Sequence, residues 1–483
     1  MIPFLITSLS ITLLFRWIQR RSYRFRFWTR QGVPGPRPNF FFGNLLDIAR
    51  YGGNIRAQSK WFQNYSNNQR TVGIFFGATP AIITTDLDLL RTVLIKESGP
   101  NGAFSDRQRF VSNWCPFPER TYLDGLIYTS SDRWQKQRKV LDPAFKSSKL
   151  KSALTIINDC NQTMMDVVQN QFQKSEIDSR NMWKRYSTDV IFQTAFGIID
   201  ERIQKADLTK SNLVRDYPLI DATNRITNTS VFQPFLLLLI LFPEMSWFLK
   251  PFWIVCNWIS ARVVGIRRAR PMHFLCSFLT NVIRSRESDP SLCRPDLLQS
   301  LMDSRTKSKS SSGLSENEVC GNLGVFYIAG HETTSLTLEF ATHWLMNRAD
   351  IQDQCRQEVM SIIDRDGQLN YDNILNDLDM LESVVKETLR LHPPVTMFVT
   401  RQAITDFTYI RDCGLGPKSI FIPKGTVVIV PIVEIQRDKS YWSEPDEFRP
   451  ERFYKTASSI QQLAFLAFGT GPRGCIGKRS ISN

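Results

Sequence analysis

The chain contains 483 residues, of which 42% are hydrophobic and 22% are charged. This balance is typical of a globular protein and excludes a largely disordered one. The formal net charge of +14 leaves three classes of partner open: nucleic acid, an anionic membrane surface and an acidic protein. The nine cysteines include no C-x-x-C pair, so they do not form the pattern of a disulfide framework and fit a reducing compartment.

The amino terminus is apolar and is followed directly by positive charge. Residues 2–15 carry only apolar and hydroxyl side chains. The cations behind them are all arginines: Arg16, Arg20, Arg21, Arg24, Arg26 and Arg30. Positive charge after an apolar run predicts that the rest of the chain stays on the cytosolic side. A cleaved signal peptide is disfavoured because no basic region precedes the apolar run. We expect a signal anchor or transmembrane helix at 1–18, although a full span takes about 20 residues. A basic, Pro-rich linker is expected at 19–38.

Beyond the linker, helical periodicity dominates from about residue 130 to 395. Residues 72–77 and 81–84 predict the two strands of a hairpin, and residues 421–422 and 427–430 also predict strands. Long helices are expected at 316–347, with Ser315 and Glu318 at the spacing of a capping box, and at 376–391. The apolar run 231–242 is too short to span a bilayer and predicts a buried or membrane-dipping segment. The expected fold class is mainly α with minor β.

Close to the carboxyl end, residues 468–477 match the pattern F-x-x-G-x-R-x-C-x-G at every fixed position. A cysteine that binds a metal as thiolate needs nearby N–H donors and positive potential, and glycines let the backbone approach its sulfur. A G-x-G-x-x-G match in the same stretch does not predict a dinucleotide site, because no acidic residue follows about 20 positions later. The pattern resembles the haem-binding segment of the cytochrome P450 superfamily. The resemblance implies that Cys475 is the axial ligand of the haem iron and that Phe468 and Arg473 bind the cofactor, Arg473 at a propionate.

Two other motifs carry the same resemblance. Glu387 and Arg390 lie at i, i+3 spacing and share a helix face, and residues 448–453 supply Arg452 about sixty residues later. The family carries such residues as a buried triad. The resemblance therefore implies a structural triad of Glu387, Arg390 and Arg452 that orients the chain leading into Cys475.

Residues 329–334 read Ala-Gly-His-Glu-Thr-Thr inside the long helix expected at 316–347. A zinc site of the H-E-x-x-H type is excluded, because residue 335 is Ser335. The family carries A-G-x-[D/E]-T above the iron. The resemblance implies that Glu332 and Thr333 are catalytic, with Thr333 as hydrogen-bond donor to the activated oxygen and Glu332 as a proton relay.

Trp134 and Arg138 form a W-x-x-x-R pattern that places both side chains on one helix face. In the family this pair donates to the haem propionates. Arg401 occupies a position similar to another propionate-binding arginine, and Arg107 is a weaker candidate for the same role. The resemblance implies that these residues bind the cofactor.

The resemblance extends over about residues 33–477, and segments 186–191, 294–299 and 421–425 are most similar to the animal microsomal family of broad-substrate, drug- and steroid-oxidising enzymes. It implies the cytochrome P450 fold, with a single large haem domain at 39–483 that holds haem b. It also implies the endoplasmic reticulum membrane, with the catalytic domain on the cytosolic side. In the family some tens of residues follow the cysteine, whereas residues 476–483 follow it here, so we expect this domain to be C-terminally incomplete.

The implied activity is that of a monooxygenase, which inserts one oxygen atom from O₂ into a small apolar substrate. Electrons would come from NADPH through NADPH-cytochrome P450 reductase, whose acidic face would meet the basic stretch from Arg133 to Lys151. No nucleic-acid role is expected, since no recognition motif accompanies the basic residues. Two alternatives stay open: a haem-thiolate isomerase or dehydratase that works without a reductase, and a truncated, haem-poor and inactive isoform.

Overall fold

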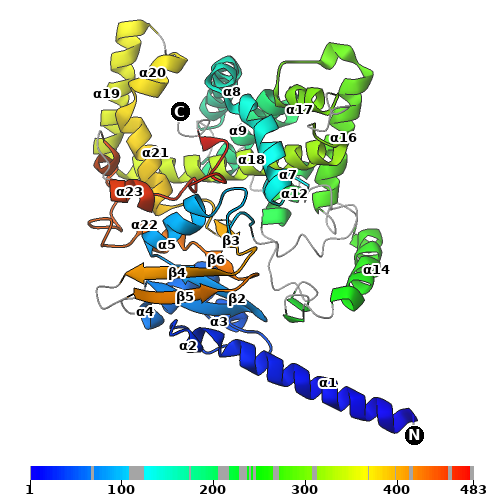
Figure 1. The fold of residues 1–483 in the computed structure, drawn as a ribbon. Coiled ribbons are helices and arrows are strands. Elements are labelled where there is room, and N and C mark those ends of the chain that lie inside the picture. The colour runs from blue at the N-terminus through cyan, green and yellow to red at the C-terminus, as the bar shows by residue number, and fades with distance from the viewer. Residues whose placement is uncertain are drawn as a thin grey trace.

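A computed structural model describes most of the chain (Figure 1). The described ranges are 2–66, 70–107, 124–172, 176–204, 217–227, 237–238, 241–242, 246–264, 271–306, 313–367, 369–396, 399–412, 417–454 and 459–478. Most of the apolar run 231–242 lies outside them.

The structure is mainly helical, as the sequence predicts. The longer helices are α1 (Ile2–Phe25), α4 (Asn54–Tyr65), α7 (Ser131–Leu141), α8 (Ser147–Phe172), α9 (Ser179–Ile191), α12 (Pro218–Thr227), α14 (Ser246–Val264), α16 (Pro271–Ser288), α17 (Leu297–Thr306), α18 (Glu316–Asn347), α19 (Ala349–Asp366) and α21 (Asp379–Leu391). The shorter α-helices are α2 (Phe27–Arg30), α3 (Leu45–Arg50), α5 (Leu87–Arg91), α10 (Glu201–Gln204), α20 (Tyr371–Asn376), α22 (Ile432–Gln436) and α23 (Ser459–Ala464). Short π- and 3₁₀-helical turns occur at Thr92–Lys96, Asp142–Phe145, Phe192–Phe196, Pro290–Leu292 and Pro450–Phe453.

The strands form two small sheets. The strands β1 (Thr71–Phe76), β2 (Thr79–Thr84), β6 (Val427–Ile429) and β3 (Thr400–Gln402) make one sheet in the order β1-β2-β6-β3. The predicted hairpin is confirmed, because β1 and β2 pair antiparallel. A second sheet holds β4 (Phe407–Asp412) and β5 (Pro417–Ile422). The two strands expected near 421 and 428 therefore both exist but belong to different sheets.

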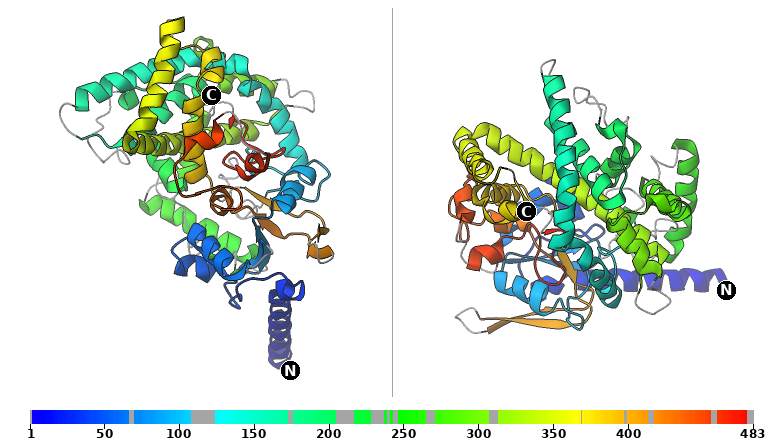
Figure 2. Two further views of the ribbon diagram at one scale, coloured as in Figure 1. Left: turned by 90° about the vertical axis from the view of Figure 1, so that its left-hand side faces the viewer. Right: turned by 90° about the horizontal axis from the view of Figure 1, so that it is seen from above.

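Helix α18 runs through the helical part of the molecule (Figures 1 and 2). The predicted capping box is present: the Ser315 hydroxyl accepts from the Glu318 N–H at 3.2 Å, and the Glu318 carboxylate accepts from the Ser315 N–H at 2.8 Å. Helix α9 lies against α18, and a Cβ on Gly330 would be 2.9 Å from Cδ1 of Ile191. Glycine at this position therefore permits the close approach of the two helices.

Helix α1 projects away from the sheets and the other helices in every view (Figures 1 and 2). It continues past residue 18 to Phe25, into the segment expected as a linker. Several of its large apolar side chains are exposed: Leu9, Ile11, Leu13, Leu14 and Phe15. Within the described ranges, no helix combines the length and apolar character that a bilayer-spanning helix requires, so the expected transmembrane helix is not supported.

The base of α1 is fixed to the body by Arg21. This guanidinium is buried and donates to the carbonyl oxygens of Phe40 at 2.7 Å, Phe41 at 2.7 Å and Leu241 at 3.0 Å. It also lies over the ring of Trp17, with 5.2 Å between Cζ and the ring centroid. A cation that emerges behind an apolar run in the sequence thus serves as a structural contact rather than a solvated charge.

Candidate active site

Cys475 lies in a glycine-rich loop after α23. Its backbone N–H donates to the Phe468 carbonyl at 2.9 Å, which closes the loop on itself. Gly471 has a φ of +73°, and a Cβ there would lie 1.9 Å from the carbonyl oxygen of Leu94. Because neither the conformation nor the space admits a side chain, the glycine is needed for the shape of the loop.

The sulfur of Cys475 is partly open to solvent and partly surrounded by protein. Desolvation by the surrounding protein raises the pKa of this thiol, whereas the Gly477 N–H and the cations Arg138 and Arg107 act in the opposite direction. A bound metal cation would remove the proton, because a coordinating thiol is held as thiolate. The chain becomes helical at Lys478, and its further course lies outside the described residues.

Buried arginines gather beside this loop. Arg401 is 1% exposed, and its Nε donates to the Ser98 hydroxyl at 3.1 Å. Burial lowers the pKa of Arg401, and the positive charges of Arg107 and Arg473 lower it further. Burial also lowers the pKa of Arg107, whose Nε has no hydrogen-bond partner among the described residues. Within the described ranges no carboxylate reaches Arg107 or Arg401 within ion-pair distance.

Arg473 and Arg138 hold the loop from two sides. The Arg473 guanidinium donates to the carbonyls of Ser105 at 2.9 Å and Thr129 at 3.2 Å, and its Cζ lies 4.6 Å from the ring centroid of Trp134. A carboxylate oxygen of Asp106 lies 3.6 Å from Arg473. Arg138 donates to the Gly474 carbonyl at 3.0 Å and pairs with Asp142 at 2.6 Å.

These residues fit a haem. A haem needs one axial protein ligand and donors for two anionic propionates. Arg401 is buried and Arg107 is half-buried with a buried, unpartnered Nε, and neither has a carboxylate partner within the described ranges. Both are donors that an anionic ligand would satisfy. Cys475, Trp134 and the four arginines at 107, 138, 401 and 473 therefore form one constellation, although they come from distant parts of the chain.

The middle of α18 supplies a second polar group. Ala329 is exposed although the helix from Glu318 to Tyr327 is buried. The Thr333 hydroxyl donates to the Ala329 carbonyl at 2.6 Å, which is the usual local bond of a threonine within a helix. Glu332 turns toward α9, where Nζ of Lys184 lies 3.6 Å from its Oε2. The side chains of Thr333 and Glu332 therefore point in different directions from α18.

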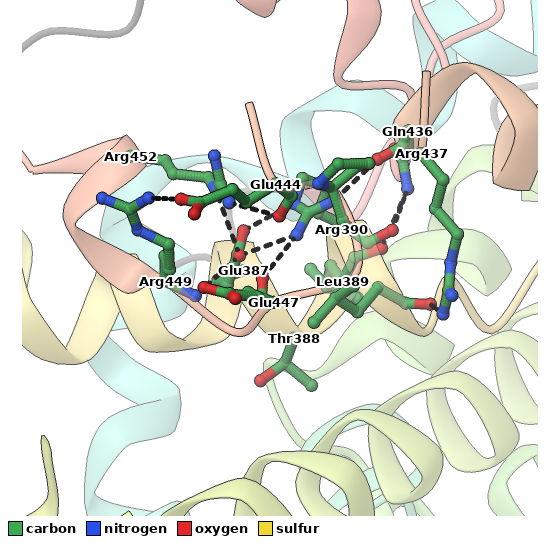
Figure 3. Close-up of polar contacts among 12 residues, drawn as sticks. Glu387, Thr388, Leu389, Arg390, Gln436, Arg437, Glu444, Glu447, Arg449 and Arg452 are labelled. Atoms are coloured by element: carbon green, nitrogen blue, oxygen red, sulfur yellow. Dashed lines mark hydrogen bonds and ion pairs between the residues drawn. The ribbon is translucent and has the colours of Figure 1, made fainter. Parts of the chain in front are cut away.

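The predicted contact of Glu387, Arg390 and Arg452 is present (Figure 3). Glu387 and Arg390 are both 0% exposed. Two nitrogens of Arg390 donate to the two carboxylate oxygens of Glu387 at 2.7 and 2.8 Å, and Nε of Arg452 donates to the same carboxylate at 3.2 Å. The carboxylate also accepts the backbone N–H of Arg449 at 2.9 Å.

The comparisons with known proteins agree with this geometry. The family model described as Cytochrome P450 matches residues 33–479. The chain belongs to the cytochrome P450 family. It is 31% identical to cytochrome P450 3A29 of Sus scrofa over 462 residues, which covers 95% of this chain and 84% of that protein. It is 30% identical to cytochrome P450 3A5 of Homo sapiens over 478 residues, with 98% and 86% covered. The predicted family is therefore confirmed, and the chain is a cytochrome P450 monooxygenase.

Several residues of this P450 that hold the constellation together were missed by sequence reasoning. Gln436 on α22 donates to the carbonyls of Leu389 and Arg390 at 3.1 and 2.9 Å and accepts the N–H of Leu466 at 2.9 Å. It therefore ties the end of α21 to the segment that leads into Cys475. No local pattern predicts this role, because the partners lie between 30 and 47 positions away. Sequence reasoning also missed the contact of Lys184 with Glu332, because the two residues lie on different helices.

Proposed function

We propose that this P450 is a haem-thiolate monooxygenase that inserts one oxygen atom of O₂ into a small apolar substrate. The observation that supports it most directly is the meeting of Cys475 with buried, carboxylate-free guanidinium groups at one place in the fold. Haem b, when bound, supplies oxygen activation. The electrons come from NADPH through NADPH-cytochrome P450 reductase.

Each residue of the site has a distinct task in this proposal. Cys475 binds the iron, and the backbone of the glycine-rich loop keeps its sulfur accessible. Arg107 and Arg401 neutralise the propionates, because their charge is not compensated within the described protein. Trp134, Arg138, Arg473 and Phe468 complete the cofactor-binding surface, by donating a hydrogen bond or by fixing the loop. The Glu387, Arg390 and Arg452 triad acts structurally.

Thr333 and Glu332 handle protons. The Thr333 hydroxyl, which donates to the Ala329 carbonyl at 2.6 Å, would turn from this carbonyl to donate its hydrogen bond in the oxygen-activating chemistry that haem would supply. Glu332 supplies the proton that the hydroxyl passes on. The Glu332 side chain is only 19% exposed, so in this proposal protons reach the carboxylate through the groups beside it rather than directly from bulk solvent.

The exposed lysines of α7 and the following residues form the reductase surface in this proposal: Lys136, Lys139, Lys146 and Lys149. Arg133 does not belong to this surface, since it pairs with Glu318 at 2.7 Å and with Asp124 at 2.9 Å. An acidic partner face would be steered toward the lysines, and the steering would weaken as salt is added.

We also propose attachment to the endoplasmic reticulum membrane with the catalytic domain on the cytosolic side. Helix α14 exposes Phe252, Val255, Trp258 and Val263, with Val263 78% exposed. Together with the apolar side chains of α1, these would enter the interface of a bilayer. Flotation of the full chain with phosphatidylcholine–phosphatidylserine vesicles tests this.

The test of the core proposal is the difference spectrum of the reduced protein with carbon monoxide. The unchanged chain should bind one haem per protein and show the long-wavelength Soret band of a thiolate-ligated haem. Cys475→Ser should lose this band, whereas Cys256→Ser, at an exposed cysteine on α14, should keep it. Retention of both haem and band in Cys475→Ser would contradict the proposal.

A further inference from the structure

The carboxylate of Glu332 is part of a buried polar network between α9, α12 and α18. Nζ of Lys184 lies 3.6 Å from Oε2 of Glu332 and donates to Oδ1 of Asn224 at 2.6 Å. Nε2 of His331 lies 3.9 Å from the same Oε2. The side chains of Lys184 and Glu332 are 13% and 19% exposed, and His331 is completely buried. This is an ion pair shielded from solvent, unlike the many surface pairs of the chain.

The hydroxyl groups of α9 contact the other nitrogen of His331. Nδ1 of His331 lies 3.0 Å from Oγ1 of Thr188 and 3.1 Å from Oγ of Ser187. Both hydroxyls also lie within hydrogen-bond distance of the Lys184 carbonyl, at 2.7 and 3.1 Å. The imidazole is therefore held between α9 and the Glu332 side of the network.

Nε2 of His331 and Oε2 of Glu332 are both buried without a hydrogen-bond partner among the described residues. The Lys184 ammonium, 3.6 Å from Oε2, is the group that compensates the charge of this carboxylate. Burial and the charge of Lys184 lower the pKa of His331 to about 3, so the imidazole is neutral at physiological pH.

We propose that Lys184 is a positioning residue for Glu332, which holds the Oε2 edge of the carboxylate on the α9 side and so controls how this carboxylate delivers protons. The inference rests on the proposed monooxygenase function. Lys184 supplies the compensating charge, and Asn224 fixes the ammonium so that it cannot turn away.

The groups that face this carboxylate come from three elements. Lys184 comes from α9, His331 and Tyr327 from α18, and Asn224 on α12 acts through the lysine. The Tyr327 ring stacks on His331 at 5.7 Å between centroids. Burial raises the pKa of Tyr327, so the phenol stays protonated and adds no negative charge. Lys184 is therefore the positive charge on which the carboxylate depends within the described residues.

The experiment uses the membrane-bound holoenzyme with reductase, NADPH and O₂ and needs no substrate. Reduction of O₂ to hydrogen peroxide takes two electrons and two protons, and consumes one NADPH per O₂. Reduction to water takes four electrons and four protons, and consumes two NADPH per O₂. The ratio of NADPH to O₂ therefore measures how often protons arrive before peroxide leaves.

Lys184→Met should lower this ratio toward one and raise the share of peroxide, and the pH dependence of the ratio should change. Lys184→Arg should restore the ratio, because it keeps the charge. Arg180→Met is the matched control: Arg180 pairs with Glu339 at 3.1 Å across the same two helices but does not contact Glu332. A ratio for Lys184→Met that equals that of Arg180→Met would overturn the proposal.

A second measurement needs no turnover. Urea unfolding gives the equilibrium constant of unfolding for Lys184→Met, for Glu332→Gln and for the double variant. Its change in the double variant should differ about fivefold from the product of the changes in the two single variants. Additive effects would also overturn the proposal. The carbon monoxide spectrum separates the two failures, since a thiolate band in Lys184→Met with an unchanged ratio refutes the role of Lys184 while the monooxygenase function stands.

Discussion

The contribution of Arg390 to stability can be worked out from its contacts. Besides two bonds to Glu387, its guanidinium donates to the carbonyls of Gln436 at 2.8 Å, Pro445 at 2.7 Å and Glu447 at 3.0 Å (Figure 3). Breaking a buried ion pair from one side costs about 3–5 kcal/mol, and each carbonyl left without a donor adds roughly 1–3 kcal/mol. We expect Arg390→Leu to cost more than about 5 kcal/mol, which approaches the whole stability of many domains.

The neighbouring arginines supply graded controls. Arg452→Leu removes one bond to Glu387 and should cost about 1–3 kcal/mol. Arg449 contacts Glu387 through its backbone N–H, while its side chain pairs with Glu444 at the surface. Arg449→Leu should therefore cost about 1 kcal/mol at most.

The assay is urea unfolding followed by circular dichroism, with haem content measured on the same samples. The expected order of midpoints is wild type and Arg449→Leu highest, then Arg452→Leu, then Arg390→Leu. An Arg390→Leu midpoint equal to that of Arg449→Leu would refute the reasoning, because it would mean that the buried contacts contribute no more than exposed ones. Arg390→Lys separates charge from geometry: it keeps the cation but cannot form the bidentate pair, so its midpoint should fall between those of Arg390→Leu and Arg449→Leu.

Three further outcomes are expected. Gly471→Ala should abolish the thiolate band in the carbon monoxide spectrum, because the added Cβ would lie 1.9 Å from a backbone oxygen, whereas Gly367→Ala should keep it, since nothing lies within 4 Å there. Because the folded-state pKa of His331 (about 3) is lower than the unfolded value of about 6.5, the unfolded state binds the proton first, so stability falls as pH drops from about 6.5 toward 3. Between pH 7 and pH 5 the free energy of unfolding should fall by about 2 kcal/mol because of His331. In His331→Asn this part of the shift in urea midpoint between the two pH values should be absent. Arg286→Leu should cost about 3–5 kcal/mol in the same assay, since it leaves the bidentate partner Asp296 buried and unpaired.

The parts of the fold that local sequence determines were predictable. The β1–β2 hairpin follows from two short runs rich in β-branched and aromatic residues around a turn, and the start of α18 follows from the capping-box spacing of Ser315 and Glu318. The candidate site residues were identified from the family resemblance, which also implied that they lie close together in the fold. The structure contains the contacts of Glu387 with Arg390 and Arg452.

Long-range pairing was not predictable. The strands near 421 and 428 appear in sequence as neighbours joined by a turn, yet β5 pairs with β4 and β6 with β2 and β3, because strand partners depend on the whole sheet. Lys184 appears in sequence as an ordinary charge on a polar helix. It becomes largely buried because α9 packs closely against α18, and no pattern within α9 carries that information.

The arginines of this chain show why burial alone does not identify a binding residue. Arg390 and Arg401 are both completely or almost completely buried, and both lie within the region that the P450 family model matches. The N–H groups of the Arg390 guanidinium donate to protein acceptors, and Glu387 compensates its charge. Replacing Arg390 should therefore lower stability. Arg401 and Arg107 lack a carboxylate partner within the described residues, and the positive charge of Arg107 lowers the pKa of Arg401. Charge that the protein leaves uncompensated is better explained by an anionic ligand than by structure, which is why the proposed function assigns the propionates to these two arginines rather than to Arg390.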